Sequence, residues 1–506
     1  MLRSRDEGEG SEAASVIGLT RPDWLLHDAR VLTLDARRPV AEAIAVRGGR
    51  VLALGSSAAL RRLTGPGTET VDCRGATVLP GLIDPHLHLF GLAARRLNLD
   101  CSSVASVADL LAVVGTRARD VPPGAWIRGE GLDEVRLGRL PTAAELEAAA
   151  PGRPVRLRHR SRHASVLSTS GLHRLGEGSG VETRDGAVTG LVSGREEALG
   201  RLVGPLPADG LREALAATAR ELAALGVTTV ADATPRGPGQ LAPLREAMAA
   251  GRFPLRVFAM RRPGSRPWAP SGRLLPGAVK VMVEEDRLGF RPRPATLARR
   301  IRKAAADGAQ VAVHCVGAGT LVAALAAFAG VRGAGRSARR HRLEHVAECP
   351  PPLVGRIAAL GLTVVTNPAF VHWRGDAYVD ETAPGARRWL YRTRSLLGAG
   401  IPLAGASDAP VVPASPWIGI AAARSRRTAG GIVLGPAERI GAAAALRLFT
   451  TGAAFVLGAD RLGRLVPGGP ADLVVVEPDP LRASPDEVFA ARVRLTLVAG
   501  ERAWPA

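Results

Sequence analysis

Apolar runs and helix-like segments alternate along the middle of the chain. Four short apolar runs end in polar side chains and close on His314, His345, Asn367 and Asp408. Helix-like segments rich in Ala and Arg cover 295–307, 320–329, 350–360 and 386–399. Strand followed by helix, repeated, is typical of βα units and a parallel sheet. Functional groups at successive strand ends further favour an α/β fold of the TIM (β/α)8 barrel type.

The two ends of the chain carry a different pattern. Short strand-like runs occur over 25–34, 43–46, 51–55 and 70–79, and again over 471–476 and 493–498. We expect these strands to pair into one small β-sandwich, a discontinuous domain made of residues 22–80 and 456–506. Residues 81–455 then form the barrel, a length that fits a barrel with a large insertion.

The insertion, at about 90–210, separates the first barrel strand from the next apolar run at 226–230. We expect it to cover the active site. Residues 1–21 are polar and contain Gly, Glu and Ser without the apolar stretch of a signal peptide, so we expect a disordered tail. No apolar run approaches the ~20 residues needed to cross a membrane.

The first barrel strand carries two histidines two positions apart. The turn Pro80-Gly81 precedes a short strand that ends in His86 and His88. On a strand, residues i and i+2 point to the same face. The two imidazoles can therefore converge on one metal ion, and the preceding Pro-Gly turn and Asp84 strengthen this interpretation.

Lysine is almost absent from this chain. Only Lys280 and Lys303 are lysines among 67 Lys and Arg residues. Lys303 lies in an Arg-rich helical segment where any cation would serve. Lys280 lies in the apolar run 278–283, which predicts a buried strand, where a protonated ammonium is costly. Of Lys and Arg, only Lys can lose its charge near neutral pH, so a lysine at position 280 indicates that an amine is needed there. The alternative interpretation is a core lysine held by an ion pair.

The formal charge of +20 raises the question of nucleic-acid binding, especially through Arg336, Arg339, Arg340 and Arg342. Against it, the arginines are spread along the chain, aromatic residues make up only 4%, and no nucleic-acid motif is present. We therefore expect no nucleic-acid partner and no membrane partner. The four cysteines show neither a disulfide framework nor zinc-ribbon spacing, which favours a cytoplasmic location.

Taken together, the motifs resemble the metal-dependent amidohydrolase superfamily, and closely its amidohydrolase-3 (YtcJ-like) branch. The matching segments span roughly residues 23 to 500 and are 80–88, 126–131, 226–232, 279–280, 313–314, 342–345 and 407–410. The set is highly specific for the superfamily and uninformative about the substrate. The chain departs from the branch at 284–287, Glu-Glu-Asp-Arg, where an Asp-Gly-Ser-type loop often follows the lysine.

The resemblance implies a metal centre with two divalent ions. It makes six side chains metal ligands: His86, His88, Lys280, His314, His345 and Asp408. The first two would hold one ion, and His314 and His345 the other. Lys280 would react with CO₂ to form a carbamate that bridges both ions, and Asp408 would ligate the first ion and act as general base. Zinc is expected first, with Mn, Co or Fe as alternatives.

The chemistry of such a centre is hydrolytic. Two divalent ions roughly 3.5–4 Å apart hold a bridging hydroxide, because metal binding lowers the pKa of water from about 15.7 toward ~7. In the implied reaction the hydroxide attacks a polarised carbonyl, and Asp408 passes its proton to the leaving amine. The expected activity is hydrolysis of a non-peptide C–N bond of a small molecule: an amide, an N-substituted amide, a carbamate or a cyclic amide.

Four further residues are candidate substrate contacts: His163, Trp126, Asn367 and Glu344. His163 could equally have a capping or surface role. Asn367 and Glu344 could instead hydrogen-bond to metal ligands, or be ordinary strand-end polarity.

Two other functions remain open. One is a mononuclear deaminase of the same superfamily, but such enzymes usually carry a Glu shortly after the histidine of the fifth strand, and no acid occurs between His314 and Leu321. The other is a degenerate barrel without activity, which would be marked by a lost ligand, whereas all six are present. Members of the family often dimerise, so a homodimer is a further expectation.

Overall fold

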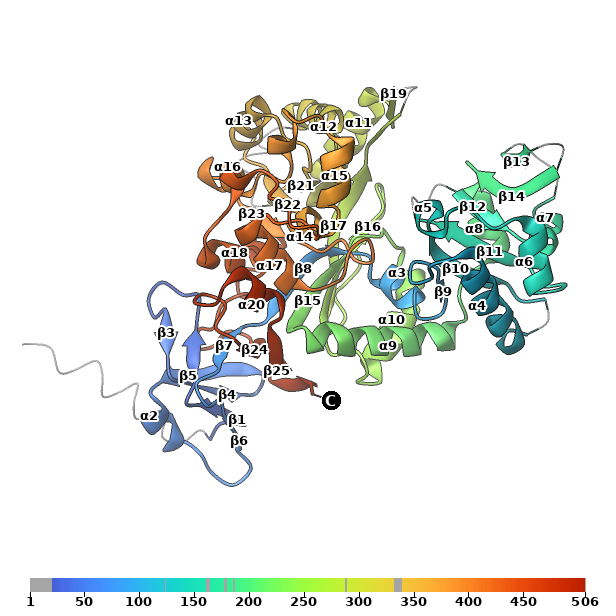
Figure 1. Cartoon of the computed structure of the whole chain (residues 1–506). Coiled ribbons are helices and arrows are strands. Elements are labelled where there is room, and N and C mark those ends of the chain that lie inside the picture. The colour runs from blue at the N-terminus through green and yellow to red at the C-terminus, as the bar shows by residue number, and fades with distance from the viewer. Residues whose placement is uncertain are drawn as a thin grey trace, which may run out of the picture. The chain divides into compact units, whose positions relative to one another are not determined.

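The computed structural model describes residues 21–122, 124–160, 164–176, 180–184, 187–286, 289–331 and 339–505 (Figure 1). The chain forms two compact units. One contains the residues up to Leu89 and those from Thr218 onward, and the other contains Phe90–Ala217. The predicted tail up to residue 20, His163 and Arg336 lie outside the described residues.

A parallel sheet of eight strands forms the barrel of the first unit, in the order β23-β22-β21-β20-β17-β16-β15-β8. Its strands are β8 Leu82–Leu87, β15 Val227–Asp232, β16 Arg256–Arg261, β17 Leu274–Met282, β20 Val311–Cys315, β21 Arg342–His345, β22 Thr363–Thr366 and β23 Leu403–Gly405. Figure 1 shows β8, in blue, beside the green β15. Backbone hydrogen bonds from Asp408 N to His86 O (2.8 Å) and from His88 N to Ala409 O (2.7 Å) join the first strand to the segment after the last. The barrel is therefore nearly closed, and the predicted TIM-type fold is confirmed.

Helices follow the barrel strands in sequence. They are α9 Ala208–Ala224, α10 Ala242–Ala249, α11 Pro294–Ala306, α12 Ala318–Ala329, α13 Pro351–Ala359, α14 Ala369–Trp373, α15 Gly375–Glu381, α16 Thr393–Gly398, α17 Pro416–Ser425, α18 Ala442–Leu448 and α19 Thr451–Val456. In α11, Pro294 occupies the first turn, where its fixed φ and missing N–H are tolerated. Leu297, Ile301 and Ala304 of α11 are buried while Lys303 is exposed, the one-sided pattern of a helix packed on a sheet.

The sequence predicts one continuous helix over 386–399, and this prediction is wrong. The segment 386–399 contains a 3₁₀ turn, Arg387–Trp389, and then the separate helix α16. Between them the buried guanidinium of Arg426 donates hydrogen bonds to the carbonyl oxygens of Leu390 (2.8 Å) and Tyr391 (2.7 Å). Tyr391 also has a φ of 47°, outside the helical range. A distant side chain therefore divides what the local sequence favours as one helix.

After β17 the chain forms a small hairpin. Strand β18 Glu284–Asp286 pairs antiparallel with β19 Gly289–Arg291. Strand β18 contains Glu284, Glu285 and Asp286, three of the four residues at which the sequence departs from the common pattern of the branch.

Two small sheets of the first unit lie outside the barrel, and in the second of them strands from both ends of the chain pair. The first sheet, in the order β5-β4-β1-β6, contains β1 Trp24–His27, β4 Ala43–Arg47, β5 Arg50–Gly55 and β6 Glu69–Asp72. The second, β26-β25-β24-β7-β2-β3, contains β2 Arg30–Leu32, β3 Val40–Ala41, β7 Thr77–Pro80, β24 Leu473–Glu477, β25 Arg492–Val498 and β26 Glu501–Trp504. Leu26, Ile44, Val78, Leu473 and Leu495 share one core cluster between them. The predicted pairing of the two chain ends is confirmed.

The second unit, Phe90–Ala217, has a mixed sheet of its own, in the order β13-β14-β12-β11-β10-β9. Its strands are β9 Leu99–Asp100, β10 Ile127–Leu132, β11 Val155–His159, β12 Ala164–Leu167, β13 Val181–Arg184 and β14 Ala187–Ser193. Its longest helix that ends within the unit, α4 Val107–Asp120, buries Leu110 and Val114 in a separate cluster with Leu146 and Leu157. This unit occupies the range of the predicted insertion; that it covers the active site stays a prediction. Among the described residues, no helix has the length and apolar character required to cross a bilayer.

Candidate metal centre

Six side chains converge where the barrel strands end. They are His86 on β8, His88 directly after β8, Lys280 on β17, His314 on β20, His345 on β21 and Asp408 in the segment that follows β23. The carboxyl ends of parallel strands lie at one face of a barrel, so residues far apart in sequence meet there. The structure thus brings together all six side chains that the sequence analysis singles out as ligands.

His86, His88 and Asp408 have the spacing of a metal site. Nε2 of His86 lies 3.5 Å and Nε2 of His88 lies 3.3 Å from Oδ1 of Asp408. One ligand atom from each residue lies within 4.8 Å of the others. Oδ1 of Asp408 is buried and accepts no hydrogen bond from the described residues. A buried carboxylate oxygen without a donor calls for a cation or water, so the donor set fits a divalent ion.

Three further side chains lie next to these three residues, on the side of His86: Lys280, His345 and His314. Nζ of Lys280 lies 3.3 Å from Nε2 of His86, and the Lys280 residue is only 3% exposed. The ring centroids of His86 and His345 are 4.7 Å apart, and those of His345 and His314 are 4.6 Å apart. The six side chains therefore form one continuous cluster.

Burial fixes the protonation state of the histidines. Removal from water lowers the pKa of His345, lowers the pKa of His86 well below its usual value, and lowers the pKa of His314 to about 2. Desolvation has this effect because it disfavours the charged form. The imidazoles are consequently neutral, which is the state that binds metal ions.

The surroundings affect the protonation of Lys280 and Asp408 differently. Burial lowers the pKa of Lys280, which favours the neutral amine. Burial by itself raises the pKa of Asp408, but the neighbouring imidazoles of His88, His345 and His86 lower it by more, so the carboxylate stays ionised. The cluster thus combines an ionised carboxylate with a lysine whose neutral form is favoured by burial.

Polar side chains hold the rings of three histidines through their Nδ1 atoms. Glu344 pairs with Nδ1 of His86, Oγ1 of Thr234 lies 2.7 Å from Nδ1 of His88, and Oδ1 of Asn367 lies 2.8 Å from Nδ1 of His345. Each contact engages one ring nitrogen and leaves Nε2 available as a ligand. Such contacts orient the ring and raise its basicity toward a metal ion.

Two candidate substrate contacts lie behind the histidines. Glu344 is fully buried, and its Oε1 is 2.7 Å from Nε of Arg342. Asn367 is 1% exposed and donates to the carbonyl oxygen of Ala406 (3.1 Å). Both therefore occupy the positions expected of hydrogen-bonding partners of metal ligands.

The other two candidate substrate contacts belong to the second unit. Trp126 lies there with the guanidinium of Arg174 6.0 Å from its ring centroid. His163 falls outside the described residues. Substrate contact by either residue stays a prediction.

Sequence reasoning missed Asp232 and Thr234. Asp232 is fully buried at the end of β15 and accepts hydrogen bonds from Thr234 N–H and from Nε of Arg236, both at 3.2 Å. It thereby fixes the loop that presents the Thr234 hydroxyl to His88. A signal was available, because Asp232 ends one of the segments that resemble the superfamily.

Asp84 was given no role of its own. Its carboxylate accepts hydrogen bonds from the backbone N–H (3.2 Å) and the hydroxyl (2.5 Å) of Ser407. Burial raises the pKa of Asp84 to about 7. The contact ties β8 to the segment that carries Asp408 and so sets the position of that ligand relative to His86.

An apolar cluster adjoins the metal centre. The segments after β21, β22 and β23 contribute Ala347, Phe370 and Val412, together with the only two tyrosines of the chain, Tyr378 and Tyr391. The two hydroxyl groups are 2.9 Å apart. Burial raises the pKa of both tyrosines, and the nearby charge of Asp408 raises both further. The cluster therefore lies within electrostatic reach of the centre.

Comparison with known proteins shows similarity along nearly the whole chain. Residues 69–503 match the amidohydrolase family. The N-substituted formamide deformylase of Arthrobacter pascens is 29% identical over 94% of this chain and 97% of that protein. YtcJ of Bacillus subtilis, which carries the name of an amidohydrolase, is 26% identical over 94% of this chain and 98% of its own. The crystal structure of an uncharacterized metal-dependent hydrolase from Pyrococcus furiosus superposes with a TM-score of 0.74 at 26% identity, covering 91% of this chain and 100% of the other.

Proposed function

This chain belongs to the amidohydrolase family, as a metal-dependent hydrolase, and on that premise we propose that it cleaves a non-peptide C–N bond of a small molecule. The observation that carries the proposal is the convergence of four histidines, Lys280 and Asp408 at one face of the barrel. We further propose two divalent ions, zinc first, with Mn, Co or Fe as alternatives.

In this proposal, different residues hold the metal ions and transfer the proton. His86, His88 and Asp408 would hold one ion, and His314 and His345 the other. Bound ions supply positive charge that polarises a carbonyl group and acidifies water. Asp408, ionised and at hydrogen-bonding distance from His88, accepts the proton of the attacking water and returns it to the leaving amine.

Lys280 is proposed to act as a carbamate formed with CO₂. An ammonium would place a positive charge 3.3 Å from the very ring nitrogen of His86 that faces a cation, which is unfavourable. A carbamate instead offers two anionic oxygens to the ions. This assignment also gives a reason for a buried lysine in a chain whose basic residues, apart from Lys280 and Lys303, are arginines.

We place N-substituted amides first among the substrates. The relative from Arthrobacter pascens that aligns over nearly its full length acts, by its name, on N-substituted formamides. Carbamates and cyclic amides have the same scissile bond and stay in the proposal as further substrates.

The mononuclear deaminase is the second candidate, and Lys280 argues against it. A deaminase requires neither the amine nor its carbamate, whereas Lys280 is buried within the histidine cluster. The reaction products separate the two functions. Hydrolysis of an N-substituted formamide yields formate and a primary amine, and deamination yields ammonia.

The test is a panel of N-substituted formamides, acetamides, carbamates and cyclic amides offered to protein supplied with zinc or manganese. We expect release of a primary amine from at least one class, at a rate reduced by about 10²–10⁴ in Asp408→Asn. Release of ammonia alone from amino-substituted heterocycles would favour the deaminase. Failure of every class with fully metallated protein would contradict the proposal.

A further inference from the structure

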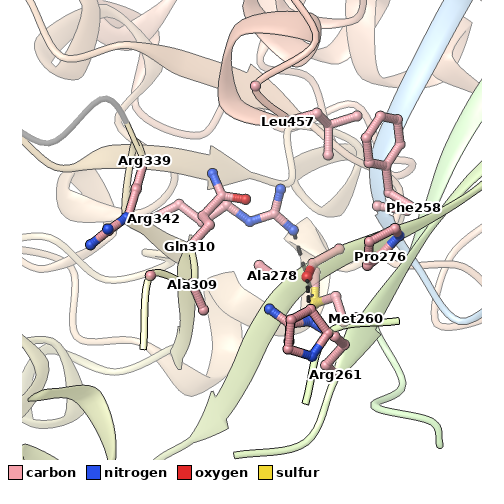
Figure 2. A pocket seen from close by; sticks show the side chains of 15 residues that line it. Phe258, Met260, Arg261, Pro276, Ala278, Ala309, Gln310, Arg339, Arg342 and Leu457 are labelled. Carbon is pink, nitrogen blue, oxygen red and sulfur yellow. Dashed lines mark hydrogen bonds between the residues drawn. The ribbon is translucent and has the colours of Figure 1, made fainter. Parts of the chain in front are cut away.

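Side chains alternate between the two faces of β17 and β20 near the carboxyl ends of these strands. One set packs with residues of helices α11 and α12 in a single core cluster: Val279 and Val281 of β17 and Val311, Val313 and Cys315 of β20. The set in between points the other way. Its members Ala278 and Ala312 share a second cluster with Met260, and Ala278 and Met260 also line the cavity in Figure 2. The second set therefore faces the inside of the barrel.

The inward set continues past the buried interior toward the mouth of the barrel. Lys280 is followed two residues later by Met282, the last residue of β17, and His314 is followed two residues later by Val316. The strand pairing extends to Val316, whose carbonyl oxygen accepts a hydrogen bond from the N–H of Glu348 (3.0 Å). Met282 itself pairs in register with His314. Met282 and Val316 therefore lie on neighbouring segments, on the same face as the metal ligands and nearer the strand ends.

Both of these side chains are apolar and open to solvent. Met282 is 40% exposed and Val316 is 45% exposed. Val281 and Val283, on either side of Met282, are buried, so the exposure of Met282 follows from the direction of its side chain. Single exposed apolar residues are common on proteins, but these two neighbours form an apolar surface beside a polar centre. Such a surface offers a binding place to an apolar group of a ligand, because that group gains free energy by leaving water.

The order of the strands places this surface across the barrel from Asp408. Strands β17 and β20 are the middle two of the eight, and β23 and β8 are the outermost two, which meet at the seam beside Asp408. In the proposed reaction Asp408 returns a proton to the leaving amine, so the amine of the substrate lies at the seam. The acyl group is on the other side of the scissile bond and therefore points toward β17 and β20.

We propose that Met282 and Val316 form an apolar subsite for the acyl group of the substrate, an inference that rests on the proposed hydrolase function. The substrate class is then an amide R–CO–NH–R′ in which R is aliphatic. Water adds to the carbonyl carbon and the C–N bond breaks, so the products are R–COOH and R′–NH2. Each CH2 of R that is fully buried against the subsite strengthens binding about 4-fold. A formamide, in which R is a hydrogen atom, gains nothing there.

Two series of substrates separate this subsite from the rest of the active site. The acyl series joins formyl, acetyl and butyryl groups to one amine, and the amine series joins one acyl group to methylamine, propylamine and benzylamine. The test variant is the double substitution Met282→Gln and Val316→Thr, which keeps the side chains close to their original size but makes them polar. Val40→Thr is the matched control, because Val40 is a valine of β3, outside the barrel, with a similar exposure of 46%.

We expect the ratio of kcat/KM for the butyryl over the formyl substrate to fall ~10-fold or more in the double variant. The ratios within the amine series, and every value in Val40→Thr, should stay unchanged. A general defect in folding lowers all substrates alike and leaves the ratios as they are. An unchanged acyl ratio, or a change confined to the amine series, would overturn the acyl subsite.

Titration calorimetry of the metal-loaded protein with formate and butyrate tests the subsite without turnover. We expect wild type and Val40→Thr to bind butyrate ~10-fold or more tightly than formate, and the double variant to bind the two acids about equally. Preference for butyrate in a wild type that hydrolyses no amide would support the subsite and contradict the proposed function. Hydrolysis of amides with equal affinity for the two acids, or with binding of neither, would contradict the subsite and leave the proposed function intact.

Discussion

Nε2 of His88 lies 3.3 Å from Oδ1 of Asp408 at the seam where the last barrel strand meets the first. The backbone N–H of His88 donates to Ala409 O (2.7 Å) at the same seam. Residues that close the barrel are therefore the same residues that form the metal site. Metal binding and barrel closure should consequently be linked, since a ligand that binds only the folded state stabilises it.

Removal of metal should lower thermal stability. At a free metal concentration of 100 to 1,000 times Kd, binding contributes about 2.7 to 4.1 kcal/mol, so we expect chelation to lower Tm by about 2 to 4 °C. Differential scanning calorimetry with and without chelator measures this. Re-addition of zinc should restore Tm, whereas magnesium, which prefers oxygen ligands, should not. An unchanged Tm after complete metal removal would contradict the link.

Thr234→Val should weaken metal binding without unfolding the barrel. The substitution removes the hydroxyl that contacts Nδ1 of His88 and keeps the shape of the side chain. Loss of such a contact lowers metal affinity by about 10- to 100-fold. Competition with a chromophoric chelator gives the affinity, and Thr116→Val on the exposed face of α4 is the matched control. Equal affinities in all three proteins would show that Thr234 has no part in orienting His88.

Asp408→Asn should abolish turnover while leaving the fold intact. The amide keeps the size of the side chain but cannot accept a proton, and general-base removal costs about 10²–10⁴ in rate. The measurement is kcat on whichever amide the wild type hydrolyses, with Asp209→Asn, whose side chain is 88% exposed, as control. Activity within a few-fold of wild type would exclude Asp408 as the base.

Glu438 should make the stability of the fold depend on pH. Burial by itself raises its pKa, but hydrogen bonds from Ser395 and the charge of Arg392 lower it overall. A lowered pKa in the folded state means that its contribution is complete above the unfolded value of about 4.3 and is lost as pH falls through the folded value.

The variant Glu438→Gln isolates this contribution. Hydrogen bonds to a charged group contribute about 1.5–3 kcal/mol, so we expect the variant to be less stable by that amount at pH 7. The difference in Tm between the two proteins, followed from pH 7 down to pH 3, should shrink below about pH 4.3. A difference that stays constant or grows in acid would show that the carboxylate charge is not responsible.

The candidate metal ligands could be picked out of the sequence because they carry local signals. His86 and His88 share a face by strand alternation, and Lys280 stands out as a charge in an apolar run. Thr234 carries no such signal, since it follows β15 in a loop and acts only because Asp232 fixes that loop. Side chains that orient ligands are chosen by tertiary contact and not by periodicity.

Arg342 is a second residue whose surroundings could not be predicted from the sequence. In sequence it belongs to a run of arginines that suggests a basic surface. In the structure it is 1% exposed, inside the barrel, because the alternation of β21 turns it inward with Glu344. Arg340 pairs instead with Asp460, a carboxylate brought near only by folding. A run of charged residues in the sequence therefore does not reveal which of its side chains face solvent.

The pairing of the short strands in the inserted unit could not be predicted from the sequence either. There β11 pairs in parallel with β10 and antiparallel with β12, in a sheet of its own. Strands of four to six residues fit several pairings equally well from local pattern alone. Long-range contacts decide among them, and a single sequence does not display those contacts.

The metal content of the purified protein tests the central claim most directly. Plasma mass spectrometry should be applied to wild type, Lys280→Ala and Lys303→Ala, where Lys303 is the exposed lysine on α11 and the matched control. We predict about two equivalents per chain in wild type and in Lys303→Ala, falling to about one or less in Lys280→Ala. About one equivalent in all three proteins would contradict a lysine-bridged pair of ions, and no tightly held metal in any of them would contradict the metal centre itself.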